Sequence, residues 1–272
     1  MVIDHNMIEN IMSIVRSAGQ EMIKIYHEGL ININVKSDDT PVTQADLLSD
    51  EIIYQGLKKL FPHIPIISEE RYKPTLSEKK KWEYYWLVDP LDGTQEFIDG
   101  SHDFAISLAL MQQHQPIFGI VYVPFTDVFY YAVENKGAFK LFDGVSQNLC
   151  ISHKKNTSIR FVVSRRQNMM RFKAHIDPNL DYKIIKSGSA ALKCCLVADN
   201  IADVYVRVGP TGEWDTAAAF CILKEAGGQL CNWHFELLRF NLRQDCINPN
   251  FFALGDPNIE WSTILFYKND DS

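Results

Sequence analysis

The chain of 272 residues lacks the cysteine and histidine spacings that mark most zinc sites and disulfide frameworks. Its six cysteines form no C-x-x-C pair, and two of them, Cys194 and Cys195, are adjacent. The eight histidines show no H-E-x-x-H pattern. The sequence therefore predicts reduced, mostly buried thiols rather than a disulfide framework or a zinc site.

Positive charge is also scarce. Lysine and arginine total 27 against 34 aspartates and glutamates, which gives a net charge of −7. No excess of basic charge is available to neutralise the phosphates of a nucleic acid polymer or an anionic membrane. A small anionic substrate stays compatible with this balance, because bound metal ions supply positive charge locally.

Long apolar runs, a leader and a triphosphate-binding loop are missing too. No run approaches the roughly 18 apolar residues that span a bilayer, so no transmembrane segment is expected. Residues 1–10 mix Asp4, His5 and Glu9 with apolar side chains, unlike a secretory signal. No G-x-x-x-x-G-K-[ST] loop occurs, which argues against a nucleoside triphosphatase. The expected location is the cytoplasm.

Residues 1–148 predict an α+β half with two amphipathic helices and a closely spaced antiparallel meander. The polar, lysine-rich residues 72–81 indicate a mobile surface loop. The helices are expected at residues 4–27 and between Pro41 and Pro62, and the strands at residues 31–36, 64–67, 84–88, 104–111, 117–123, 128–133 and 138–142.

Residues 149–272 alternate between short strands and helices, which is typical of an α/β half. This half is the smaller one, and we place the domain boundary near residue 148. Strands are expected at residues 159–163, 182–185, 204–208 and 251–254, and helices at residues 167–175, 190–198, 213–225 and 259–267.

The segment Asp89-Pro90-Leu91-Asp92-Gly93-Thr94 ends the apolar run at residues 84–88. Pro90 interrupts the strand, and Gly93 permits a sharp turn that brings Asp92 back towards Asp89. Thr94 stands where a helix can begin, with free backbone N–H groups nearby. Two carboxylates beside such a helix start suit a divalent cation that itself binds phosphate. The simpler alternative is that these residues only mark turns.

Three further acids follow the same logic. Glu69 and Glu70 come directly after a short apolar strand, although adjacent loop glutamates are usually solvent-exposed. Asp215 lies in the first turn of a helix, where it could simply complement the helix dipole by about 0.3–1 kcal/mol. If Asp215 faces Asp89 and Asp92 across the junction of the halves, the carboxylates repel, their pKa values rise, and bound cations are expected.

Three motifs in this order resemble the signatures of the inositol monophosphatase superfamily, a group of magnesium-dependent, lithium-sensitive phosphatases. The motifs are Ser68-Glu69-Glu70, Asp89-Pro90-Leu91-Asp92-Gly93-Thr94 and Trp214-Asp215-Thr216-Ala217-Ala218. The run from Lys36 to Asp46 and the pair Glu96-Phe97 are most similar to the bacterial 3′(2′),5′-bisphosphate nucleotidases of sulfur metabolism. Two positions depart from that pattern: Gln95 replaces the usual lysine and Thr40 replaces serine.

The resemblance implies a layered αβαβα sandwich of the sugar-phosphatase type. It implies removal of the 3′-phosphate from 3′-phosphoadenosine 5′-phosphate, with inositol phosphate hydrolysis as the alternative. It also implies two to three Mg²⁺ ions, a small phosphorylated nucleotide as substrate, and no nucleic acid polymer. A homodimer and peripheral association with the inner membrane are compatible with it.

The resemblance also assigns roles by position. Glu69, Asp89 and the Leu91 carbonyl would hold a first ion, and Asp89, Asp92 and Asp215 a second. Asp46 and Thr94 would relay the proton of the attacking water, with Glu70 assisting. From the residues alone, a capping-box acid is the preferred interpretation of Asp46, and only the resemblance favours the proton-accepting role. The substrate-binding residues would be Glu69, Leu91, Asp92, Gly93, Thr94, Ser187, Gly188, Ser189, Lys193 and Asp215, with Arg165 and Arg166 as weaker candidates for phosphate.

Two other classes remain as alternatives. Haloacid-dehalogenase phosphatases share the Asp-Gly-Thr ending, but they place one residue between the two aspartates, whereas this chain has Pro90 and Leu91. A covalent aspartyl-phosphate mechanism therefore fails on spacing. A non-catalytic binding protein that retained the fold is the second alternative, although every expected ligand here is still an acid.

Overall fold

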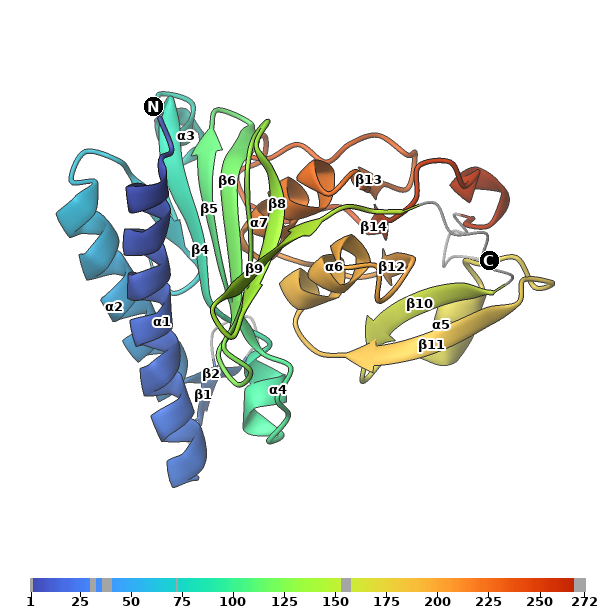
Figure 1. The fold of residues 1–272 in the computed structure, drawn as a ribbon, viewed down its shortest axis with the longest axis horizontal. Coiled ribbons are helices and arrows are strands. Elements are labelled where there is room, and N and C mark those ends of the chain that lie inside the picture. Colours follow the sequence, from blue (N-terminus) through green and yellow to red (C-terminus); the bar gives the residue numbers. More distant parts are fainter. Residues whose placement is uncertain (1, 30–32, 36–40, 72, 153–157, 267–272) are drawn as a thin grey trace.

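The computed structural model describes residues 2–29, 33–35, 41–71, 73–152 and 158–266. Its layers alternate between helices and sheets, as Figure 1 shows, and this confirms the expected αβαβα arrangement. Helices α1 (His5–Glu28) and α2 (Gln44–Leu60) cover one face of a seven-stranded sheet. Helices α6 (Ala190–Ala198) and α7 (Glu213–Glu225) lie between that sheet and a five-stranded sheet, whose far face carries α5 (Met169–Lys173).

The seven-stranded sheet is the predicted meander, extended by one strand at each edge. Strand β3 pairs in parallel with β4, and every later neighbour pairs antiparallel. The strands, in spatial order, are β3 (Ile66–Ser68), β4 (Tyr84–Asp92), β5 (Ala105–Gln112), β6 (Gln115–Val123), β7 (Val128–Val133), β8 (Gly137–Phe142) and β9 (Val145–Leu149).

The five-stranded sheet is mixed, with β10 parallel to both β11 and β12 and the remaining pairs antiparallel. Its spatial order is β11 (Tyr182–Ser187), β10 (Ile159–Ser164), β12 (Val204–Arg207), β14 (Phe251–Leu254) and β13 (Gln229–Asn232). Outside the two sheets, β1 (Ile33–Val35) pairs with β2 (Pro41–Thr43). Three short elements complete the described fold: α3 (Leu76–Lys79), α4 (Thr94–Ile98) and a 3₁₀ turn at Trp261–Thr263.

Helix α7 lies directly against the middle of the seven-stranded sheet because small residues meet at the point of contact. A Cβ atom on Gly119 of β6 would stand 2.4 Å from the carbonyl oxygen of Ala218 in α7. Ala217, Ala218 and Ala219 are fully buried. This close approach sets the first turn of α7, which carries Asp215, beside the ends of β3 and β4.

Several expectations about single elements were wrong. Residues 72–81 are not simply a surface loop, because α3 forms there and Lys79 is fully buried, with its Nζ donating to the Arg243 carbonyl at 2.8 Å and lying 3.0 Å from Cys246 Sγ. The helix expected at residues 259–267 is only a 3₁₀ turn, with residue 267 outside the described residues. Strands β9 and β13 were missed, since exposed polar residues hide their alternation.

Two other expectations concern chain boundaries and thiols. Strand β4 does not end at residue 88; it continues through a bulge between Asp89 and Asp92 that accommodates Pro90.

All six cysteines are free and five are buried, as expected. The division near residue 148 stays a prediction, and the chain at that point runs within β9, paired with β8. No helix among the described residues is long and apolar enough to cross a bilayer.

Candidate metal centre and active site

The acids at the carboxyl ends of β3 and β4 are placed by adjacent strands. Because β3 and β4 are parallel, their ends lie at the same edge of the sheet, and the Glu69 amide donates to the Val88 carbonyl at 3.1 Å. Asp89 follows Val88 and is 2% exposed. The bulge then turns the chain, and the Leu91 amide donates to Asp89 Oδ1 at 3.0 Å. Glu69 and Asp89 therefore project from neighbouring strand ends into one site.

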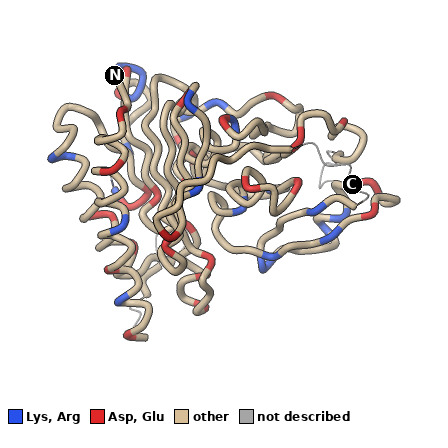
Figure 2. Tube along the Cα trace, viewed as in Figure 1, with Lys and Arg blue, Asp and Glu red and all other residues tan. Residues whose placement is uncertain are grey.

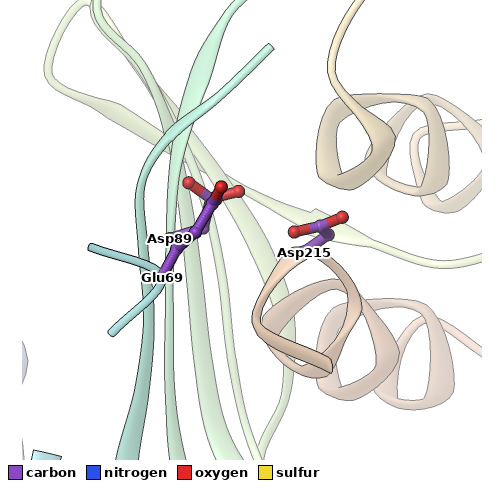
Figure 3. A group of neighbouring side chains, drawn as sticks. All are labelled: Glu69, Asp89 and Asp215. Atoms are coloured by element: carbon purple, nitrogen blue, oxygen red, sulfur yellow. The ribbon is translucent and has the colours of Figure 1, made fainter. Parts of the chain in front are cut away.

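Asp215 approaches the same point from the opposite side. It lies in the first turn of α7, where its Oδ2 accepts a hydrogen bond from the Gly212 amide at 3.1 Å. One carboxylate oxygen from each of Glu69, Asp89 and Asp215 lies within 4.8 Å of the others. Figure 3 shows the first two side chains directed across a gap towards the third. The structure thus brings together acids that are up to 146 positions apart in the chain, 69 to 215.

Asp92 has a different environment from the other three acids. It lines the same cleft, but its Oδ2 accepts hydrogen bonds from Ser189 Oγ at 2.5 Å and from the Ala191 amide at 2.7 Å. Both donors belong to the start of α6. One carboxylate oxygen of Asp92 is therefore engaged in docking α6, and Asp92 lies outside the three-acid group.

The electrostatics of the three-acid group favour a bound cation. Burial, followed by repulsion from Glu69, Asp215 and Asp92, raises the pKa of Asp89 well above its ordinary value. Burial, followed by repulsion from Asp92 and Glu69, raises the pKa of Asp215 well above its ordinary value. Carboxylate oxygens are hard ligands of the kind that Mg²⁺ takes, and a cation would relieve this repulsion. The residues present therefore fit a divalent metal ion.

These pKa shifts predict an unusual pH dependence of stability. In the metal-free protein the folded state holds protons on Asp89 and Asp215 that the unfolded chain has already released, so stability falls as the pH rises above about 4. We expect the midpoint temperature of unfolding of chelator-treated protein to fall as the pH rises above about 4, and we expect Mg²⁺ to reverse this fall. Thermal unfolding across pH measures it. Asp215→Asn is the comparison, and an unchanged pH dependence in that variant would contradict the assignment.

The contacts of Asp46 suit both of the roles expected for it, that of a capping-box acid and that of a proton acceptor. Its Oδ2 accepts from the Thr43 amide at 2.8 Å and from Thr43 Oγ1 at 2.6 Å, which completes the capping box of α2. Its Oδ1 accepts from Thr94 Oγ1 at 2.9 Å. Burial raises the pKa of Asp46, while the hydrogen bonds from Thr43 and Thr94 oppose the shift. Each oxygen thus has one task, and the capping and proton-accepting interpretations are compatible.

The predicted substrate residues of the second half lie behind the cleft. Ser189 donates to Asp92, and the Nζ of Lys193 donates to the carbonyls of Gly188 at 3.1 Å and Ser189 at 2.8 Å. Lys193 is 3% exposed, and a Cβ on Gly188 would lie 2.3 Å from Glu96 Cγ. Ser187, Gly188, Ser189 and Lys193 therefore fix the turn before α6, and none of them is among the described residues that line the cleft.

Three further expected residues lie elsewhere. Glu70 is half-buried beside Ser68, and the described cleft lining does not include it. Arg165 forms an ion pair with Asp103, and Arg166 forms two ion pairs of 2.6 Å, one with Glu96 and one with Asp99. Both arginines thus join the second half to the α4 region, and their charges are already compensated. The expectation that they anchor phosphate is not supported by these contacts.

The cleft in front of the acids has a volume of about 490 Å³ and walls that sequence reasoning missed. Trp214 and Ile247 form part of the lining, and Lys73 lies 4.4 Å above the Trp214 ring. The segment around Ile247 is fixed by Asn248, whose Nδ2 donates to the Gly212 carbonyl at 2.8 Å. Ile247 lies outside the helices and strands of the described chain, so no periodicity signals its place. The rest of the described lining is Pro41, Glu69, Asp89, Leu91, Asp92, Gly93, Thr94, Gln95, Glu96, Pro210, Thr211, Gly212 and Asp215.

Comparison with known proteins places these features in a family. Residues 4–258 match the model of the inositol monophosphatase family. The 3′(2′),5′-bisphosphate nucleotidase CysQ of Aggregatibacter actinomycetemcomitans is 35% identical to this chain, and the match covers 98% of this chain and 99% of the relative. The CysQ of Escherichia coli K12 is also 35% identical, and that match covers 90% of this chain and 98% of the relative. The crystal structure of CysQ from Bacteroides thetaiotaomicron superposes with a TM-score of 0.77 at 31% identity, covering 91% of this chain and 96% of that one. The chain belongs to the inositol monophosphatase family.

Proposed function

We propose that the chain is a Mg²⁺-dependent phosphatase that hydrolyses the 3′-phosphate of 3′-phosphoadenosine 5′-phosphate to give AMP and phosphate. The observation that carries the proposal is the convergence of Glu69, Asp89 and Asp215 on one point of an open cleft. The substrate class rests on the relatives named 3′(2′),5′-bisphosphate nucleotidase, which match this chain over nearly its whole length. The apolar walls formed by Trp214 and Ile247 suit a nucleobase.

Two to three Mg²⁺ ions are proposed for the site. Glu69, Asp89 and the Leu91 carbonyl would hold one ion, and Asp89, Asp92 and Asp215 would hold another. When bound, such ions supply Lewis-acid stabilisation of the phosphoryl charge and lower the pKa of water. The two hydrogen bonds to one oxygen of Asp92 leave its other oxygen for this role. Gly93 and Thr94 then offer the start of α4 to the phosphate.

The proton of the attacking water has a path through Thr94 and Asp46. Thr94 lines the cleft, and its hydroxyl donates to Asp46 Oδ1. Thr94 Oγ1 can therefore accept a proton from the water while it passes its own hydroxyl proton to the Asp46 carboxylate. Because burial raises the pKa of Asp46, this carboxylate is a stronger base than an exposed aspartate. Glu70 is proposed to assist, and Ser187, Gly188, Ser189 and Lys193 to support the nucleotide side through the turn that they build.

The binding partner, the compartment and the oligomeric state of the enzyme are also proposed. The partner is a small phosphorylated nucleotide rather than a nucleic acid polymer, in line with the excess of acidic residues. Six free cysteines suit a reducing compartment, and we propose the cytoplasm. A homodimer is part of the proposal by family resemblance alone.

A side-by-side assay of phosphate release tests the substrate. Purified protein with Mg²⁺ is given 3′-phosphoadenosine 5′-phosphate in one series and inositol 1-phosphate in the other, and kcat/KM is compared. We expect the nucleotide to be preferred by at least about 10-fold, since a site that matches a substrate discriminates by one or more factors of ten. Preference for the inositol ester would make the chain an inositol monophosphatase, and no hydrolysis of either ester would favour a non-catalytic binding protein.

A further inference from the structure

Helix α2 holds three separate segments of the site through polar side chains on one face. Asp46, Ser49 and Asp50 are spaced at i, i+3 and i+4, so they lie on the same side of the helix. All three are buried. Asp46 accepts from Thr94, and Ser49 Oγ donates to the Pro90 carbonyl at 2.8 Å. The third side chain, Asp50, has no part in the proposed chemistry.

Asp50 holds both ends of the turn that carries Glu69. Its Oδ1 accepts a hydrogen bond from Ser68 Oγ at 2.5 Å, and its Oδ2 pairs with Arg71 Nε at 2.6 Å. Ser68 directly precedes Glu69, and Arg71 follows it by two positions. The Arg71 guanidinium also lies 3.8 Å above the Tyr54 ring of α2. One carboxylate that is 5% exposed thus ties residues 68–71 to α2.

Glu69 needs such support because its neighbours repel it. Strand β3 ends at Ser68, and in the turn that follows the Glu69 amide donates to the Val88 carbonyl at 3.1 Å and the Arg71 amide donates to the Ser68 carbonyl at 3.3 Å. The carboxylates of Asp89 and Asp215 lie within 4.8 Å of the Glu69 carboxylate. Where these carboxyl groups are ionised and no cation lies between them, like charges at this separation push the turn away from the cleft.

We propose that Asp50 is a positioning residue that preorganises Glu69 for metal binding by fixing the turn of residues 68–71 on α2. This inference rests on the proposed metal site and concerns the affinity for Mg²⁺, not the chemical step. Asp50 is neither among the described residues that line the cleft nor one of the three acids. Loss of its charge releases Arg71 and weakens the bond to Ser68, so that Glu69 has to be ordered again when the ion binds.

Calorimetric titration of metal-free protein with Mg²⁺ alone tests the inference. Asp50→Asn is expected to raise the dissociation constant for Mg²⁺ by about 10-fold, the size typical of lost groups that orient metal ligands. At saturating Mg²⁺ its kcat should return close to the wild-type value, with KM for the nucleotide unchanged. The matched control is Glu51→Gln, which removes the exposed partner of the same arginine, bonded to Arg71 Nη2 at 2.6 Å, and should bind Mg²⁺ like wild type.

The outcomes separate the two proposals. If the wild-type protein binds no Mg²⁺, the proposed metal site is wrong. If the wild type binds Mg²⁺ and Asp50→Asn binds it equally well, or loses kcat that saturating Mg²⁺ does not restore, the positioning role is wrong and the metal site stands. Should Asp50→Asn fail to fold, Ser68→Ala deletes only the hydroxyl at the other end of the bond, and wild-type affinity in that variant overturns the inference.

Discussion

Asp89→Asn is expected to lower turnover of the nucleotide by about 10³-fold or more while the fold persists. Asp89 is a buried acid of the group, and Glu69, Asp215 and Asp92 repel its carboxylate. A metal ion that acts as a Lewis acid contributes several kcal/mol to the transition state, and about 4 kcal/mol corresponds to about 10³-fold in rate. Steady-state kinetics over a Mg²⁺ series measures the loss, and calorimetry should show weakened binding of the ion.

The fold should survive this substitution because the neutral asparagine side chain relieves repulsion rather than creating a cavity. The metal-free variant is expected to unfold at the same temperature as wild type or above it, since one buried charge is removed from the cluster. Asp143→Asn, at the exposed turn between β8 and β9, removes the same charge elsewhere and should leave turnover unchanged. Undiminished turnover in Asp89→Asn would refute the bridging role.

Asp46→Asn is expected to lower kcat by about 10²- to 10⁴-fold, the range for loss of a general base, with little change in Mg²⁺ affinity. The asparagine side chain offers one acceptor oxygen where the Asp46 carboxylate offers two, so it cannot both cap α2 and accept from Thr94. It also cannot take up a proton at neutral pH. Single-turnover kinetics at saturating Mg²⁺ isolates the chemical step.

Thr43→Ala separates the cap from the base. This variant removes the Thr43 hydroxyl, which bonds Asp46 Oδ2 at 2.6 Å, and leaves the Thr94 bond in place. It should cost about 1 kcal/mol of stability, as lost caps do, and reduce kcat far less than Asp46→Asn. Equal losses of kcat in the two variants would show that Asp46 acts only as a cap.

The acids of the site could be picked out as candidates because each lies in a short sequence pattern that indicates its local backbone structure. Asp89-Pro90-Leu91-Asp92-Gly93 specifies a strand end, a bulge and a left-handed glycine, and Gly93 has a φ of 99°. The same holds for Asp215, which stands three positions after Gly212 at a helix start. Glu69 follows directly from β3, which pairs with β4. These patterns depend on backbone geometry within a few residues, so they can be recognised one segment at a time.

Other assignments depended on partners that the sequence does not indicate. Lys79 looked like part of a lysine-rich surface loop, yet its side chain ends beside Arg243 and Cys246, more than 160 positions away. Arg165 and Arg166 were weaker candidates for phosphate binding from the sequence, and in the structure they form ion pairs with Asp103, Glu96 and Asp99. Figure 2 shows basic and acidic residues interspersed along much of the described chain.

Most helices and strands and the turns that carry the acids follow from periodicity and from residues that only certain backbone conformations accept. The family follows from the resemblance of three short motifs to its signatures, so the sequence alone contains it as well. The tertiary structure decided the rest. It brought Asp215 to Glu69 and Asp89, engaged Asp92 with α6, gave the two carboxylate oxygens of Asp46 separate partners, and made Asp50 the support of the Glu69 turn. Charge repulsion and hydrogen bonding act through space, so their partners become known only when packing has set the distances between distant segments.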